Sequence, residues 1–289
     1  MSGKEGNKQF RNSVFCSYFN ESIRLLSLCN AILGTDYQDA AQLKINTLEG
    51  IFFDDQKNDI SCTLGDTFLV LIEHQSSVNE NMPLRCLSYV AELLNKLITD
   101  KKKIYRKALI KFPAPRFIVL YNGDDAEPLQ REMRLSEAFD GAGSALELVV
   151  TSYNINHGLN QPLLGKCPYL NDYSLLVAEV KTLLVAGLNR REAIRQAVKN
   201  CLAKGIMGKY LVEHAEEVTN MLSLEWNLDD ALQARFEDGR DDGIESVALN
   251  LLNMGLTVEK IQEATKLSME RIKELAADFR KQKTSDNLT

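Results

Sequence analysis

The sequence predicts an α/β protein in which helices flank a mixed β-sheet and the C-terminal region is helical. Residues 68–72 and 117–121 are short apolar runs with β-branched members, which favours buried strands. An amphipathic segment at residues 83–100 separates them, and a strand–helix–strand order is typical of an α/β core. Beyond Tyr173, helical periodicity replaces the strand-like runs, so the second half of the chain is predicted to be helical.

The other elements of the predicted core have local signals of their own. In residues 13–33, apolar side chains recur at helical spacing, and Gly34 is placed to end that helix. Residues 43–48 and 51–53 favour strands. Further along, we expect a strand at 146–150 and helices at 175–186, 190–204 and 213–235.

A polar, glycine-containing stretch at residues 237–243 indicates either a domain boundary or a helical extension. We therefore divide the chain into a large domain at residues 10–236, with its helical extension, and a small helical module with a tail at residues 237–289. The module should contain short helices that follow the N-cap candidates Thr257 and Ser268. It resembles a helix-turn-helix reader, and a dimerisation module is an equal alternative. The helices expected there span 244–253, 258–264 and 269–279.

Residues 58–75 are the most informative stretch for function, because two strand-like runs flank the turn residues 65–66. If the turn centres on Asp66, Asp59 lies opposite Glu73. Directly opposed residues of a hairpin have Cβ atoms about 4.5–5.5 Å apart. The sequence therefore predicts that two carboxylates meet at one end of the sheet.

Side chains alternate along a strand, so Glu73 and Gln75 share one face while His74 points to the other. Asp59, Glu73 and Gln75 can then converge, and carboxylates are ligands that Mg2+ prefers. In the alternative interpretation Asp59 caps a turn, and Glu73 and Gln75 lie on the solvated end of an edge strand. His74 is expected to be a packed or surface side chain, with a role as catalytic base as the alternative.

Several blocks in the same order resemble a known family. Asp59 followed by Glu73-His74-Gln75 after an apolar strand resembles the D…ExQ form of the PD-(D/E)XK nuclease core. The blocks that follow resemble the recombination-promoting nuclease family, also described as transposase-like, from about residue 10 to about residue 277. These blocks are the helix beginning Met82-Pro83-Leu84-Arg85, the segment Pro115 to Gly123, and the tail segments 243–256 and 265–268.

The resemblance implies a restriction-endonuclease-like fold and a metal-dependent DNA endonuclease. Asp59 and Glu73 would hold Mg2+ (or Mn2+), and Gln75 would take the position where the superfamily often has a lysine. Glu21, in the first helix, fits the place of an additional metal-binding acid.

The helix that follows the hairpin adds two DNA-contacting candidates. Some members of the superfamily carry a Gln-x-x-x-Tyr motif here, and Arg85 and Tyr89 have that spacing with arginine in place of glutamine. Residues four apart lie on one face of a helix. The expectation is that Arg85 contacts the scissile phosphate and that Tyr89 orients it.

A basic segment follows that helix, with Lys101, Lys102 and Lys103 at its start. It is either a phosphate-contacting loop or a solvated linker between helix and strand. The chain as a whole has a formal net charge of −6, which counts against broad, non-specific binding of nucleic acid. Any DNA contact is therefore expected to be local.

The composition places the chain among cytoplasmic proteins that do not enter membranes. Six scattered cysteines without a C-x-x-C pair favour reduced thiols over disulfides or a zinc site. The N-terminus has no apolar core of a signal peptide, and there is no run of apolar residues long enough to span a bilayer.

The leading functional hypothesis is a Mg2+-dependent DNA endonuclease that promotes recombination or processes mobile elements. A defence nuclease would use the same site. The competing class is an inactive nuclease fold that binds DNA or protein, because glutamine at position 75 brings no positive charge. One site per chain suggests a homodimer if both strands of a duplex are cut.

Overall fold

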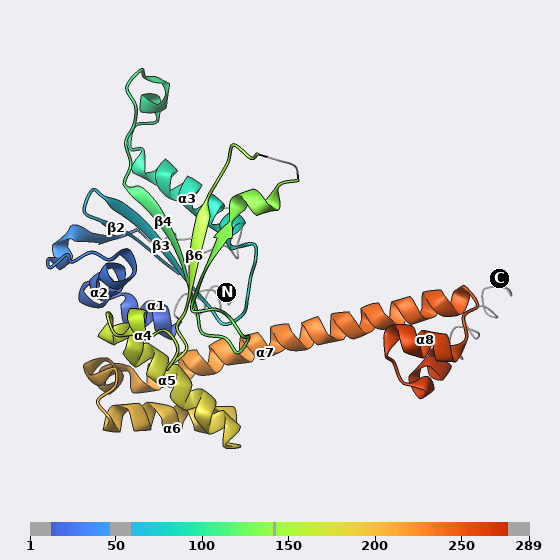
Figure 1. Ribbon diagram of the computed structural model, residues 1–289. Coiled ribbons are helices and arrows are strands. Elements are labelled where there is room, and N and C mark those ends of the chain that lie inside the picture. The colour runs from blue at the N-terminus through green and yellow to red at the C-terminus, as the bar shows by residue number, and fades with distance from the viewer. Residues whose placement is uncertain (1–12, 47–58, 141–142, 277–289) are drawn as a thin grey trace, which may run out of the picture. The chain divides into compact units, whose positions relative to one another are not determined.

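The computed structural model describes residues 13–46, 59–140 and 143–276, without the side chains of 226–238 (Figure 1). The chain divides into two compact units, Met1–Ser223 and Leu224–Thr289. The division lies within α7, Gly208–Asn253, a helical segment that is kinked at His214 (φ −128°, ψ 16°). The domain boundary expected at residue 237 falls in the same helix and stays a prediction.

The larger unit is built on a six-stranded mixed sheet with the order β1-β2-β3-β4-β6-β5, which confirms the α/β class. The β2–β3 hairpin is antiparallel, and its register pairs Ile60 with Ile72 and Leu64 with Phe68. This is the register predicted for a turn centred on Asp66. The strands are β1 Leu43–Ile45, β2 Ile60–Leu64, β3 Phe68–Gln75, β4 Ala114–Tyr121, β5 Gln130–Arg134 and β6 Val149–Asn154.

Strands β3, β4 and β6 run parallel, so their carboxyl ends meet at one edge of the sheet. Gln75, Tyr121 and Asn154 are the last residues of these strands. Ligands of open α/β sheets commonly bind at this kind of edge. Asp59 directly precedes β2, whose antiparallel direction brings its start to the same edge.

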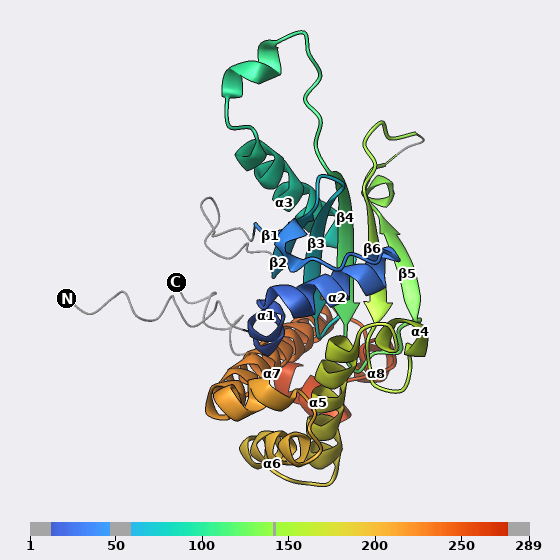
Figure 2. The ribbon, with the colours of Figure 1, turned by 90° about the vertical axis from the view of Figure 1, so that its left-hand side faces the viewer.

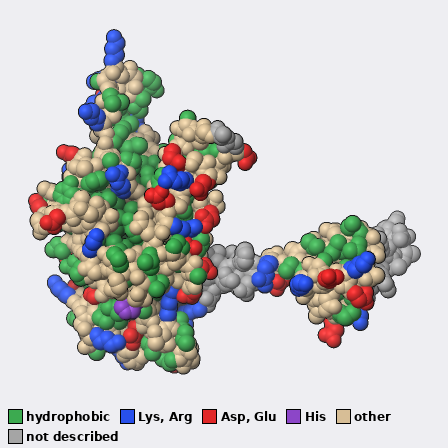
Figure 3. Space-filling model, viewed as in Figure 1, with side chains coloured by type: hydrophobic (Ala, Val, Ile, Leu, Met, Phe, Trp, Pro, Cys, Tyr) green, Lys and Arg blue, Asp and Glu red, His purple; other side chains and the backbone are tan. Residues whose placement is uncertain are grey.

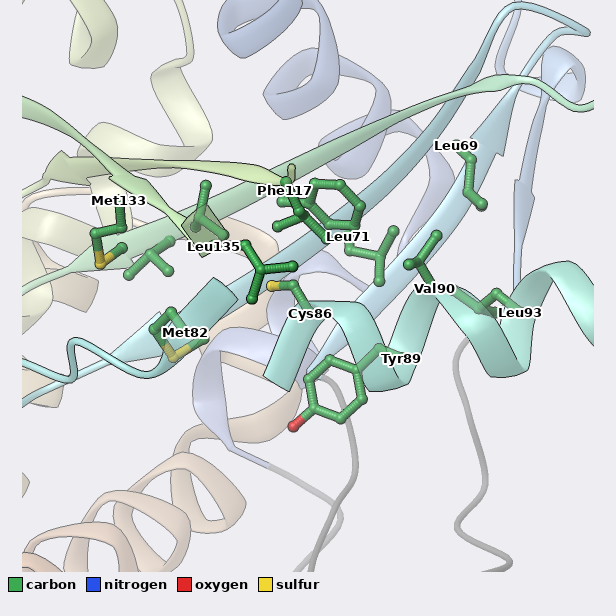
Figure 4. Close-up of a cluster of buried hydrophobic side chains, with 13 residues drawn as sticks. Leu69, Leu71, Met82, Cys86, Tyr89, Val90, Leu93, Phe117, Met133 and Leu135 are labelled. Carbon is green, nitrogen blue, oxygen red and sulfur yellow. The ribbon is translucent and has the colours of Figure 1, made fainter. Parts of the chain in front are cut away.

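Helix α3 (Met82–Leu97) covers one face of the sheet. Pro83 lies in its first turn, where a missing N–H costs nothing. Its apolar side packs on the odd-numbered residues of β3 and β4, and Figure 4 shows this buried cluster. Members of the cluster include Leu69, Leu71, Cys86, Val90, Leu93, Phe117 and Met133.

The other face of the sheet is covered by helices from both ends of the larger unit, as Figures 1 and 2 show. Here the ring of Phe15 in α1 stacks on His74 of β3, with centroids 5.0 Å apart. The helices on this side are α1 Val14–Phe19, α2 Ser22–Leu33, α4 Gln161–Leu164 and α5 Pro168–Val185, and α6 (Arg190–Ala203) packs on α5.

Three sequence predictions about elements need correction. The single helix expected at 13–33 is two helices, because Glu21 has extended backbone angles (φ −83°, ψ 125°) and begins α2 anew. Strand β5 was not predicted, because its five residues are mostly charged or polar and carry no apolar alternation. The strand expected at 146–150 begins at Val149. The second half of the strand region 43–53 lies outside the described residues.

The smaller unit contains the end of α7, the helix α8 (Val258–Thr265) and a further helical segment at residues 269–276. Its core consists of Ala248, Ile261, Ile272 and Leu275. Thr257 is the N-cap of α8, and the Ser268 hydroxyl accepts the backbone N–H of Arg271 at 3.1 Å. The expected N-caps are thus confirmed, whereas α7 runs through Gly239 and Gly243 without a break.

Candidate functional site

The hairpin places Asp59 beside Glu73. The backbone N–H of Asp59 donates to Oε1 of Glu73 at 3.1 Å. The backbone N–H of His74 donates to Oδ2 of Asp59 at 2.7 Å. These two hydrogen bonds hold both carboxyl groups at the end of the hairpin, as the sequence predicted.

Helix α3 adds a cation to this pair. Nη2 of Arg85 donates to Oε2 of Glu73 at 2.8 Å, and the Glu73 side chain is 2% exposed. The guanidinium also donates to the Tyr89 hydroxyl, from Nε at 3.2 Å and from Nη2 at 3.1 Å. Arg85 and Tyr89 thus lie on the same face of α3, as predicted. The Tyr89 ring lies apart from the other labelled core side chains (Figure 4). Asp59, Glu73, Arg85 and Tyr89 are called the carboxylate–arginine cluster below.

Burial governs the electrostatics of this cluster. Desolvation raises the pKa of Asp59 to about 6, against the opposing effects of the His74 backbone N–H and the Arg85 charge. Desolvation and the charge of Asp59 raise the pKa of Glu73 to about 8, although Arg85 opposes this shift. Burial lowers the pKa of Arg85, but its contacts with Glu73 and Tyr89 raise it overall. One guanidinium thus lies beside two carboxyl groups whose ionised forms are disfavoured by burial.

Gln75 shares the strand face of Glu73 and is the last residue of β3. It lines a small cavity between the sheet and the start of α3, together with Asn79, Met82, Tyr121 and Arg131. Its backbone carbonyl accepts the N–H of Asn122 at 3.0 Å. Gln75 is two residues beyond Glu73 in β3, so both side chains lie on the same face of the strand near its carboxyl end.

Glu21 lies elsewhere. It is the N-cap residue of α2, its side chain is 51% exposed, and it pairs with Arg24 at 2.6 Å. Within the described ranges, no group of three or more His, Cys, Asp or Glu side chains is arranged to hold a metal ion. Two carboxylates, rather than three, meet at the hairpin end.

The side of the sheet opposite to Arg85 contributes residues that the sequence did not indicate. Sγ of Cys16 lies 3.6 Å from the backbone oxygen of Asp59 and donates to it. Nε2 of His74 lies 3.2 Å from the Tyr173 hydroxyl, and burial lowers the pKa of His74 to about 4. His74 is thus a packed aromatic neighbour that faces away from Glu73, as expected. No local pattern could reveal the Cys16 contact, because 43 residues separate the partners.

Lys101, Lys102 and Lys103 do not join the carboxylate–arginine cluster. They lie in a short 3-10 helix, Lys101–Tyr105, beyond the C-terminal end of α3, whereas Arg85 is near its start. At 1.5 Å per residue, the axial distance from Arg85 to Leu97 is about 18 Å. The lysines therefore mark a separate surface.

A second group of polar side chains lies around a hollow at the carboxyl ends of β4 and β6. This open hollow of about 670 Å³ is lined in part by Asp124, Glu127, Asn156 and Lys181. Nζ of Lys181 donates to the Asn122 carbonyl oxygen at 2.6 Å and pairs with Asp124 at 2.7 Å. Since Lys181 belongs to α5, these bonds tie the turn after β4 to a helix.

No helix in the described part of the chain is long and apolar enough to cross a bilayer. No protein-family model matches the sequence. No curated protein and no solved structure matches it either.

Proposed function

We propose that this protein is a metal-dependent DNA endonuclease, with a restriction-endonuclease-like arrangement of its α/β core. The observation that carries the proposal is the pair of carboxyl groups of the half-buried Asp59 and the buried Glu73, fixed side by side at the end of a β-hairpin. An arginine beside them supplies a group that binds phosphate well. The ordered sequence blocks that resemble recombination-promoting nucleases support the same conclusion.

The residues present suit a divalent cation. Asp59 and Glu73 are oxygen donors, and one or two carboxylates with waters and substrate phosphate are a usual environment for Mg2+. Burial disfavours the negative charges of these two carboxylates. A bound divalent cation would offset that cost by compensating both charges. When bound, Mg2+ or Mn2+ supplies charge stabilisation at phosphorus and a more acidic water. Glu21 is not needed for this donor set.

The chain's own residues take the remaining roles. Arg85 supplies the positive charge that glutamine at position 75 lacks, and it acts from the helix instead of the strand. The Tyr89 hydroxyl accepts two hydrogen bonds from that guanidinium and orients it toward the phosphate. Gln75, at the same edge, is placed to position a water or a phosphate oxygen through its amide.

Cleavage of supercoiled plasmid in the presence of Mg2+ or Mn2+ tests this proposal. Wild type should nick or linearise the plasmid, and Asp59→Ala and Glu73→Gln should each reduce the rate at least about 100-fold, because each removes a metal donor. Glu216→Ala, which removes an exposed acid of α7, is the matched control and should cleave normally. Equal cleavage by wild type and both variants would exclude this site.

Binding of Mn2+ measured by calorimetry gives an independent readout. Wild type should bind the ion, and Asp59→Ala should not. The resemblance implies that such a nuclease acts in recombination or in the processing of mobile DNA. A homodimer would provide two sites for a double-strand cut.

The alternative is a non-catalytic protein that binds DNA or other proteins through the same fold. The ion pair between Arg85 and Glu73 favours it, because this contact already neutralises one of the two carboxylates. A wild type that binds DNA but neither binds Mn2+ nor cleaves in any divalent metal would support this alternative and exclude the endonuclease.

A further inference from the structure

The segment between α3 and β4 projects beyond the end of the helix as a protrusion, residues 98–113 (Figures 1 and 2). Six lysine or arginine residues and one acid lie in it, whereas the whole chain has a net charge of −6. Figure 3 shows basic and apolar side chains together at this tip. The basic residues are Lys101, Lys102, Lys103, Arg106, Lys107 and Lys111, and each is exposed.

Large apolar side chains are exposed on the same protrusion. Tyr105 is 90% and Leu109 is 85% exposed, and Ile104 is more than half exposed. A single exposed apolar residue is common, but three within six residues beside a cluster of cations are typical of a binding surface. An aromatic ring among lysines matches surfaces that bind single-stranded nucleic acid, where bases stack on aromatic rings and cations follow the phosphates.

Local hydrogen bonds give the tip a defined shape. Oδ1 of Asp100 accepts the N–H of Lys102 at 3.0 Å and caps the 3-10 helix. Oδ2 of Asp100 pairs with Arg106 at 3.3 Å. Nζ of Lys101 donates to the carbonyl oxygen of Asn95 in the last turn of α3 at 2.9 Å. The tip is thus attached to the helix that carries Arg85, and ordering it on a ligand costs less than ordering a free loop.

We propose that the protrusion is a second nucleic-acid contact, in which Tyr105 stacks on an unpaired base while Lys102, Lys103 and Lys107 contact the neighbouring phosphates. This inference rests on the proposed nuclease function and names its substrate class as DNA that contains an unpaired segment. The tip and the carboxylate–arginine cluster are separated by the length of α3. About 18 Å along the helix corresponds to roughly five stacked nucleotides at 3.4 Å each. Because Tyr105 lies beyond Leu97, the unpaired segment would lie at least about five nucleotides from the cut.

Fluorescence anisotropy with labelled DNA in EDTA tests the inference without cleavage. Wild type should bind a 30-nucleotide single strand, or a duplex with a single-stranded end, more tightly than a blunt duplex. Tyr105→Ala should weaken binding to unpaired DNA about 5- to 100-fold, as expected for the loss of one stacked base. Tyr105→Phe should bind like wild type, because it keeps the ring. Unchanged binding of Tyr105→Ala to unpaired DNA would overturn the proposal.

A charge-matched pair of triple variants tests the location of the contact. Changing Lys102, Lys103 and Lys107 to alanine should weaken binding at least about tenfold and lower the salt slope by roughly two units, at about 0.7 per phosphate contact on a single strand. Changing Arg191, Arg195 and Lys199 of α6 to alanine removes the same charge from another exposed surface and should leave binding unchanged. Equal losses in the two triple variants would overturn the proposal, as would binding of wild type to anionic phospholipid vesicles but not to DNA.

The same assay separates this inference from the proposed nuclease activity. Asp59→Ala should lose plasmid cleavage but keep its DNA affinity in EDTA. If wild type cleaves while the protrusion variants bind unpaired DNA normally, the nuclease proposal stands and the second contact is excluded.

Discussion

Nη2 of Arg85, in the first turn of α3, donates a 2.8 Å hydrogen bond to Oε2 of Glu73 near the end of β3. This contact joins the helix to the hairpin that carries both candidate metal ligands. It also places a positive charge beside the buried Glu73 side chain. The stability and pH response of the protein should therefore depend on this pair.

Arg85→Met should lower the free energy of unfolding by about 1.5–3 kcal/mol, because the hydrogen bond from the charged guanidinium is lost and the Glu73 carboxyl group stays buried without that partner. Urea unfolding at pH 7 measures the change. Arg106→Met, which removes an exposed ion pair, should cost less than about 1 kcal/mol. In the double variant Arg85→Met/Glu73→Gln, part of the loss should be recovered, because no buried carboxyl group is left without its arginine partner. Purely additive losses would contradict the coupling of the two residues.

The raised pKa values of Asp59 and Glu73 predict that the metal-free protein loses stability as the pH rises. Both groups bind protons more tightly in the folded state, with pKa values of about 6 and about 8, than in the unfolded chain. Their contribution is therefore complete below about pH 4 and is lost as the pH rises through about 8. The slope is at most about 1.4 kcal/mol per pH unit for each group.

Urea unfolding between pH 5 and 8.5 in EDTA measures this dependence. Glu73→Gln should flatten the upper part of the curve, because its side chain does not titrate. The Glu216→Ala control should follow wild type. A wild-type stability that increases from pH 6 to 8.5 would contradict the raised pKa values.

Gly123→Ala should destabilise the larger unit by at least about 1–3 kcal/mol, the usual cost of overpacking. A Cβ at Gly123 would overlap the backbone carbonyl oxygen of Ser76, which cannot move aside as a flexible side chain would. Thermal unfolding followed by circular dichroism measures the effect. Gly239→Ala is the control, because a Cβ there meets open space within α7 and alanine favours helix. An unchanged melting temperature for Gly123→Ala would show that the loop after β4, at Gly123, does not approach Ser76 after β3 this closely.

Ile261→Ala should unfold the smaller unit selectively. Ile261 is fully buried in a core of only a few side chains, and removing a buried isoleucine side chain typically costs about 2–5 kcal/mol. Limited proteolysis should then cut within residues 244–276 while the larger unit stays resistant. Met254→Ala, at an exposed position of the same unit, should leave the pattern unchanged. Simultaneous digestion of both units would argue against their independence.

The sequence alone determined the elements whose signals are local. The β2–β3 register follows from the turn residues between two strand-like runs, and it placed Asp59 opposite Glu73. The spacing of Arg85 and Tyr89 likewise follows from helix geometry. Helices with apolar stripes and local start signals, Pro83 in the first turn of α3 and Thr257 before α8, were predicted for the same reason.

Only the tertiary structure decided which side chains from distant segments meet. No sequence spacing predicts that Arg85 bonds to Glu73, because that contact depends on how α3 packs on the sheet. The same packing leaves Lys101 at the far end of the helix, and the extended backbone at Glu21 turns its side chain to solvent and Arg24. Burial, which raises the pKa values of Asp59 and Glu73, is also a property of the packed molecule and not of either residue's neighbours in the chain.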